Sequence, residues 1–136
     1  KRAAPEAAIE APVIAPVPEA AGMLDMAALA LTFGGNPDKM RKYAFMFLDS
    51  ARDGLADIGE ALDRGDVERA AEIGHRMKAS ARAVGAMDFA QLCHLLEQLR
   101  GGGAAADAGA LLARMLELRE ALAEHMAAEL GVSEPG

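Results

Sequence analysis

The strongest structural signal in the chain lies in residues 37–62, which read PDKMRKYAFMFLDSARDGLADIGEAL. Apolar residues recur in this stretch at intervals of three and four, which is the period of one helix face. They are Met40, Ala44, Phe47, Ala51, Leu55, Ile58 and Leu62. Asn36 supplies a capping side chain, and Pro37 suits the first helical position. The stretch therefore predicts one long amphipathic helix that continues almost to Arg64.

Two more helices are expected directly after this one, each preceded by a turn that contains glycine. Asp66 caps a helix that continues to about Val84, and Gly85 closes it. The next helix runs from about Met87 to Arg100. Its apolar face consists of Phe89, Leu92, Leu96 and Leu99.

A last helix follows the flexible break at residues 101–103, and we expect Asp107 to cap it. It should end near residues 130–131. Its apolar stripe consists of Leu111, Met115, Leu118, Leu122 and Met126. Before the long helix in the sequence, a short helix is expected from its cap at Asp25 through Thr32, where a pair of glycines ends it.

The composition agrees with an all-α fold. Hydrophobic residues make up 52% of the chain but aromatic residues only 4%, and the apolar content is mainly Ala, Leu and Met, which favour helices. A length of 136 residues suits one domain. Four long amphipathic helices with short connections predict an antiparallel, up-and-down four-helix bundle. The short extra N-terminal helix should cover one end of it.

The first 22 residues, KRAAPEAAIEAPVIAPVPEAAG, are predicted to form an Ala/Pro-rich linker, because their prolines interrupt any helix. Residues 23–131 should form the bundle, and residues 132–136 a disordered tail. Since the chain begins with Lys1 rather than Met, we expect it to be a fragment of a longer protein. Any membrane anchor would then lie outside it.

Charge and hydropathy exclude several classes of partner. The net charge of −7 argues against a nucleic-acid or anionic-membrane partner. No apolar run is long enough to span a bilayer, so no direct membrane contact is expected. A metal site made from His75, Cys93 and His94 is rejected, because adjacent helical positions diverge. We expect Cys93 to be a packing residue, His94 to be solvated and His125 to be partly buried.

The helix that begins after Asp66 places a histidine away from its apolar face. That face consists of Val67, Ala70, Ile73, Gly74, Met77, Ala81 and Val84. On a helical wheel, His75 points roughly 150° away from the centre of this arc. Its surface neighbours at helical spacing are Ala71, Glu72, Lys78, Ala79 and Arg82.

These neighbours suit phosphoryl transfer to nitrogen. A neutral imidazole is a good nucleophile near pH 7, because its unperturbed pKa is about 6.5. The small side chains of Ala71 and Ala79 would leave the approach to His75 clear. Lys78, and more distantly Arg82, could stabilise charge on a transferring phosphoryl group. The chain has no glycine-rich phosphate loop, so we expect no kinase activity of its own.

Residues 75–97, HRMKASARAVGAMDFAQLCHLLE, resemble the signature segment of histidine-phosphotransfer (HPt) domains. The matching features are His75, Met77, Lys78, the small residues 79–81, Gly85 and the segment 93–97. Residues 24–25, 33–37 and 64–66 also look like this family, so that the resemblance covers roughly residues 23–130. Ala79 departs from it, since glycine is usual there, and the added methyl group would narrow the choice of partner.

The resemblance implies a phosphorelay intermediate, such as the C-terminal HPt domain of a hybrid sensor histidine kinase. His75 would accept a phosphoryl group from a receiver-domain aspartate and pass it to another. Lys78 would stabilise the phosphoryl charge, and Glu97 is a candidate for orienting the imidazole. The implied partners are response-regulator receiver domains, which would hold the required Mg²⁺, and no cofactor would bind this chain. We expect a monomer in the cytoplasm, alone or as the cytoplasmic end of a membrane-anchored sensor kinase.

Phe45 and Met46 lie off the apolar stripe of the long helix, so something other than the bundle centre should cover them. The short first helix could do so through Leu24, Leu29 or Leu31. A docking receiver domain is the functional alternative, and it would make Phe45 and Met46 partner-binding residues.

Two other functions remain open. One is a kinase-fed phosphocarrier like the amino-terminal domain of a chemotaxis kinase, which the preceding linker disfavours, because that domain normally opens its protein. The other is a helical interaction module in which His75 is incidental. Receiver binding by such a module would not depend on His75 or on phosphorylation.

Overall fold

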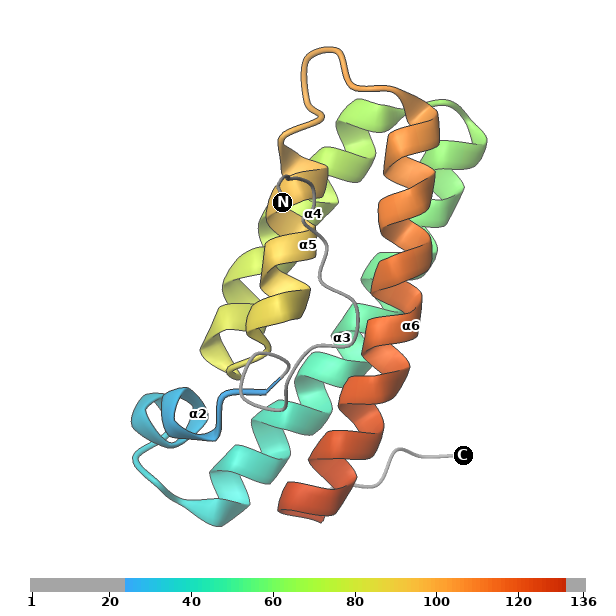
Figure 1. Ribbon diagram of the computed structural model, residues 1–136. Coiled ribbons are helices and arrows are strands. Elements are labelled where there is room, and N and C mark those ends of the chain that lie inside the picture. Colours follow the sequence, from blue (N-terminus) through green and yellow to red (C-terminus); the bar gives the residue numbers. More distant parts are fainter. Residues whose placement is uncertain (1–23, 132–136) are drawn as a thin grey trace, which may run out of the picture.

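The computed structural model describes residues 24–131, so the linker predicted for residues 1–22 and the tail predicted for residues 132–136 lie outside the described residues. Within residues 24–131 the chain forms five helices and no strand. They are α2 (Met26–Thr32), α3 (Pro37–Asp63), α4 (Val67–Ala83), α5 (Met87–Glu97) and α6 (Ala105–Leu130). The four long helices run up and down in an antiparallel bundle (Figure 1). The predicted all-α fold is confirmed.

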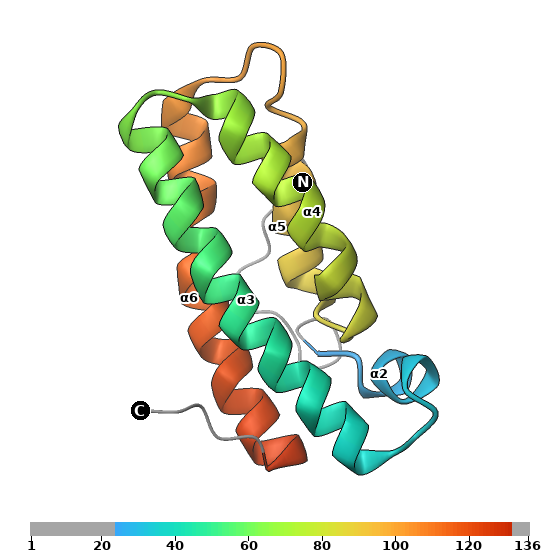
Figure 2. The ribbon, with the colours of Figure 1, turned by 180° about the vertical axis from the view of Figure 1, so that it is seen from behind.

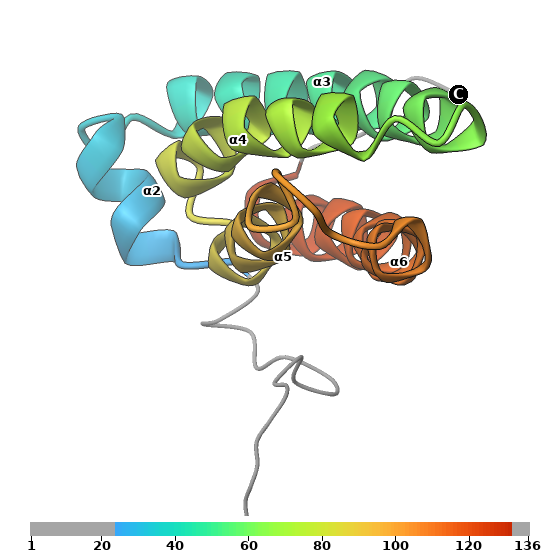
Figure 3. The ribbon, with the colours of Figure 1, turned by 90° about the horizontal axis from the view of Figure 1, so that it is seen from above.

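Each long helix packs against two neighbours. Helix α4 lies between α3 and α5, and α6 closes the bundle by packing against both α3 and α5. Seen from above, α3 and α4 form one layer and α5 and α6 the other (Figure 3). The closest association is between α4 and α5, the two helices that carry the candidate site.

The short helix α2 covers one end of the bundle, as predicted, beside the turn between α4 and α5 (Figure 2). Asp25 caps it by accepting a hydrogen bond from the Ala28 amide, 3.0 Å away. The Asp25 amide donates to the carbonyl of Gly85 at 2.7 Å, which fastens the start of α2 to that turn. Leu24 and Leu29 are buried in the core.

The predicted apolar stripes form the core. On α3, every predicted position is buried except Leu62, which is partly buried, and Leu48 and Ala61 are buried as well. On α6, Leu118 is the one stripe position that is only partly buried. The rings of Phe47 on α3 and Phe89 on α5 meet edge to face, with centroids 5.5 Å apart.

Two predicted helix ends are wrong. Helix α5 stops at Glu97 rather than Arg100, because the amides of Leu99 and Arg100 donate to carbonyls only three residues back and form a tight turn. Helix α6 begins at Ala105, with Ala104 at the cap position, so Asp107 lies in the first turn and does not cap. Alanine is the best helix former, which extends the helix towards the glycines.

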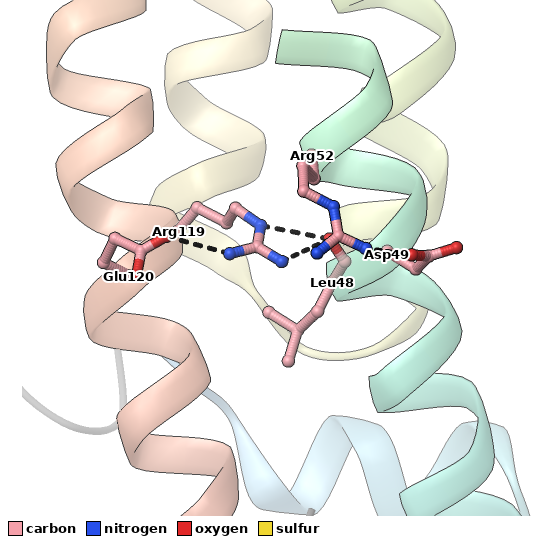
Figure 4. Close-up of polar contacts among 5 residues, drawn as sticks. All are labelled: Leu48, Asp49, Arg52, Arg119 and Glu120. Atoms are coloured by element: carbon pink, nitrogen blue, oxygen red, sulfur yellow. Dashed lines mark hydrogen bonds and ion pairs between the residues drawn. The ribbon is translucent and has the colours of Figure 1, made fainter. Parts of the chain in front are cut away.

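One charged side chain, Arg119 on α6, is buried at 4% exposure, and the sequence analysis did not anticipate it. Its Nε and Nη2 donate to the carbonyl of Leu48 on α3 at 3.0 and 2.9 Å, and Nη1 donates to Glu120 at 2.9 Å (Figure 4). The guanidinium therefore links the middle of α3 to α6. Nearby on α3, Arg52 pairs with Asp49.

None of the helices in residues 24–131 combines the length and the apolar character that a bilayer span requires.

Candidate functional site

His75 lies on the solvent-facing side of α4, as the helical wheel predicts, and its side chain is 57% exposed. Asp66 starts this helix by accepting a hydrogen bond from the Arg69 amide at 3.0 Å. The apolar face of α4 is buried against the bundle through Ile73 and Met77, which fixes the direction in which His75 points. The imidazole is therefore accessible while its backbone belongs to a packed helix.

Helix α5 brings a carboxylate to this histidine. Glu97, the last residue of α5, places Oε2 2.8 Å from Nδ1 of His75. Because a carboxylate accepts hydrogen bonds, this contact places the proton of a neutral ring on Nδ1. The lone pair is then on Nε2, the ring nitrogen outside this contact. The geometry thus supports the orienting role that the resemblance implies for Glu97.

Lys78 shares the same carboxylate. Its ammonium contacts Oε1 of Glu97, and its side chain is only 15% exposed, compared with 22% for Glu97. Lys78 therefore lies against α5, and its charge is paired, whereas the helical wheel suggested an open cation beside His75. The long side chain crosses from α4 to α5 along the helix surface.

His94 is the residue that the sequence analysis missed. Its Nδ1 lies 3.4 Å from Nζ of Lys78 and 3.9 Å from Oε1 of Glu97, and its side chain is 38% exposed. We expected His94 to be a solvated surface residue without a role in the site. The sequence did contain an indication that His94 belongs to the site. It lies one turn before Glu97, which places both side chains on one face of α5.

The charges in this cluster favour an ionised Glu97. The hydrogen bond from Lys78 is the largest cause that lowers the pKa of Glu97 below its ordinary value of 4.5, and the hydrogen bond with His75 adds to it. Glu97 therefore remains a carboxylate at neutral pH and can accept from both partners.

The predicted role of Ala71 beside the histidine is wrong in one respect, because Ala71 is fully buried and cannot line an open approach. It lies one turn before Gly74, whose nearest neighbours are atoms of α5. Ala79, Glu72 and Arg82 are exposed on α4, as predicted. Glu72 pairs with Arg69 at 2.7 Å, and this contact lowers the pKa of Glu72.

The two apolar residues off the α3 stripe differ in exposure. Phe45 is partly buried against the core, whereas Met46 is about half exposed. Leu31 on α2 is exposed too, so α2 does not cover Met46 through it. A docking role for Phe45 and Met46 remains a prediction.

The one cysteine of the chain, Cys93, lies on α5, and its third histidine, His125, lies on α6. Cys93 is buried, and this burial raises the pKa of its thiol to about 12, which fits the expected packing role. His125 on α6 is partly exposed. Between residues 24 and 131, no group of three or more His, Cys, Asp or Glu side chains is arranged to hold a metal ion.

Comparison with known proteins supports the resemblance. The family model of the Hpt domain matches residues 42–128, a range that begins in α3, ends in α6 and contains the whole cluster of His75, Lys78, His94 and Glu97. No curated protein and no solved structure matches the chain significantly.

Proposed function

The chain belongs to the Hpt domain family, and from this premise we propose that it is a phosphorelay intermediate that carries a phosphoryl group on His75. The family match gives the coarser role, which is histidine phosphotransfer in two-component signalling. The finer proposal concerns the residue that carries the group and the partners that deliver and remove it.

The observation that carries this proposal is the contact between Nδ1 of His75 and Glu97 at 2.8 Å on an exposed helix face. In a neutral ring, this contact leaves the lone pair on Nε2. A second protein can approach this nitrogen, because the side chain is largely exposed. Neither His94 nor His125 shows both a hydrogen bond to a carboxylate and a largely exposed side chain among the described contacts.

In the proposed step, Nε2 of His75 attacks the phosphorus of an aspartyl phosphate on a receiver domain. The N–P bond forms, the P–O bond to the aspartate breaks, and the aspartate leaves as a carboxylate. The ring keeps its Nδ1 proton and becomes cationic. Glu97, held ionised by Lys78, stabilises that charge. The reverse step, with a second receiver, regenerates the neutral imidazole.

The remaining residues have supporting roles in this proposal. Lys78 balances the added phosphoryl charge from its position against Glu97. Glu72, Ala79 and Arg82 lie exposed on α4 and would contact the receiver, as would Met46 farther along the bundle. The methyl group of Ala79 lies where the family usually has glycine, so Ala79→Gly should widen the range of receivers that donate.

The partners in this proposal are response-regulator receiver domains, and the Mg²⁺ that the transfer requires is held by the receiver's acidic cluster. We place the carrier, as a monomer, in the cytoplasm, alone or as the cytoplasmic end of a sensor kinase. The domain is then a reversible co-substrate without kinase activity of its own.

The test is transfer of radiolabelled phosphate from a panel of phosphorylated receiver domains. Wild type and His125→Gln, a matched loss of a distant histidine, should take up label, and His75→Gln should take up none. Label on His75→Gln equal to that on wild type would refute the proposal. Label that arrives only from an autophosphorylating kinase, and never from receivers, would favour the chemotaxis-kinase type of carrier.

A further inference from the structure

Gly74, the residue before His75, lies inside α4 and is buried. Glycine is disfavoured in the interior of a helix, because it loses more conformational freedom on folding than alanine does. Its φ is not in the left-handed range, so the backbone does not require glycine at this position. The reason for its presence must lie in what surrounds it.

The surroundings of Gly74 are parts of α5. A Cβ atom at this position would lie 3.1 Å from the carbonyl oxygen of Cys93 and 3.2 Å from Cδ2 of Leu96. The first of these atoms belongs to the backbone of α5, which cannot rotate away as a side chain can. A methyl group on Gly74 would therefore push α4 and α5 apart by a few tenths of an ångström.

This close approach is next to the site along both helices. His75 follows Gly74 on α4, and Glu97 follows Leu96 on α5. The spacing of α4 and α5 at Gly74 therefore bears on the His75–Glu97 hydrogen bond of 2.8 Å, which is formed by the next residue of each helix.

The other helical glycines differ from Gly74 in what a Cβ would meet. At Gly54 it would meet the flexible end of Met77, at Gly59 a carbon of Leu112 at an ordinary 3.8 Å, and at Gly109 nothing within 4 Å. Among these helical glycines, Gly74 is the one whose added Cβ would press on the backbone of a neighbouring helix.

We propose that Gly74 is a positioning residue that keeps α5 close enough for Glu97 to hold the His75 ring in its Nδ1-protonated form. The assignment rests on the proposed function, in which Nε2 of His75 is the nucleophile. Gly74 touches neither phosphate nor partner and acts through the spacing of the two helices alone.

The first readout is the tautomer of His75 in the unphosphorylated chain of residues 1–136, measured by ¹⁵N NMR of the ring nitrogens. Gly74→Ala should lower the ratio of Nδ1-protonated to Nε2-protonated ring by about two- to tenfold, which is the factor expected when one hydrogen bond is lost. Gly74→Val should lower it further, and Gly59→Ala on α3 should leave it unchanged. A ratio in Gly74→Ala and Gly74→Val equal to that of wild type would overturn the inference.

The second readout is the rate of phosphoryl uptake from a receiver. Gly74→Ala should slow it by a similar factor in the wild-type chain but not in a Glu97→Gln background, where the bond that Gly74 protects is already weakened. An equal slowing in both backgrounds, or amide shifts throughout α3 and α6, would assign Gly74 to the fold rather than to the site and overturn the inference. If wild type itself takes up no phosphate, the proposed function fails, whereas the tautomer result still decides the role of Gly74.

Discussion

Glu97 contacts His75 with one carboxylate oxygen, at 2.8 Å from Nδ1, although 22 residues separate the two in sequence. Its other oxygen contacts the ammonium of Lys78, one turn after His75 on α4. One carboxylate on α5 therefore joins the two α4 residues that the sequence analysis assigned to phosphoryl transfer. The site depends on the pairing of two helices and not on α4 alone.

Removing the charge of Glu97 should slow phosphoryl transfer without unfolding the bundle. We expect Glu97→Gln to reduce the rate of uptake from a phosphorylated receiver by about tenfold, since a charged hydrogen bond at a partly exposed site is lost. Stopped-flow or rapid-quench transfer assays measure this rate. Glu124→Gln, which removes an exposed charge on α6, should transfer as wild type does. An unchanged rate in Glu97→Gln would contradict the orienting role.

The same carboxylate should make the fold sensitive to acid. Lys78 and His75 lower the pKa of Glu97 from 4.5 in the folded chain, so the unfolded chain binds this proton first as pH falls. The stabilisation is fully present above pH 4.5 and is lost as pH falls through the lowered pKa. The free energy of unfolding in urea should thus decline less steeply below pH 4.5 for Glu97→Gln than for wild type. Parallel pH profiles would contradict this assignment.

A side chain at Gly85, in the turn that fastens α2 to the bundle, should lower the free energy of unfolding. Its φ is +80°, and a Cβ would lie 2.4 Å from the carbonyl oxygen of Asp25. We expect Gly85→Ala to cost about 2–3 kcal/mol, from left-handed strain and from the lost contact with Asp25. Gly65→Ala, at φ +73° with open space around it, should cost only about 1 kcal/mol. Equal losses in urea unfolding would show that the contact with Asp25 contributes nothing.

The buried guanidinium of Arg119 should matter more to stability than its surface counterparts. Arg119→Met removes two donors from the carbonyl of Leu48 and should cost about 1–3 kcal/mol. Arg41→Met breaks an exposed ion pair with Asp38 and should stay within about 0.5 kcal/mol of wild type. Urea unfolding of both variants checks this, and similar values for the two would contradict a linking role for Arg119 between α3 and α6.

The helices and the solvent exposure of His75 could be predicted, because both follow from local spacing. Periodicity along residues 37–62 gives the buried face of α3, and the same spacing places His75 opposite Ile73 and Met77. The end of α5 and the start of α6 could not be predicted, because they depend on competition between tight-turn hydrogen bonds and alanine propensity near three glycines.

The environment of the site was harder to predict, because it depends on how α5 sits on α4. A wheel drawn for α4 alone leaves Ala71 and Lys78 exposed. In the folded bundle Ala71 is buried, and Lys78 pairs with Glu97 of α5. The position of His94 in the site and the close approach of α5 to Gly74 also depend on how α5 packs on α4. The burial of Arg119 depends on how α6 packs against α3, where the carbonyl of Leu48 accepts hydrogen bonds from the guanidinium. The periodicity of the sequence does not encode this packing.

The most direct test of the account identifies the atom that carries the phosphoryl group. The ¹⁵N-labelled chain is phosphorylated by a receiver domain, and the N–P coupling is read by NMR at neutral to alkaline pH. The account predicts a single phosphorylated nitrogen, Nε2 of His75. A phosphoryl group on Nδ1 of His75, or on His94 or His125, would contradict it.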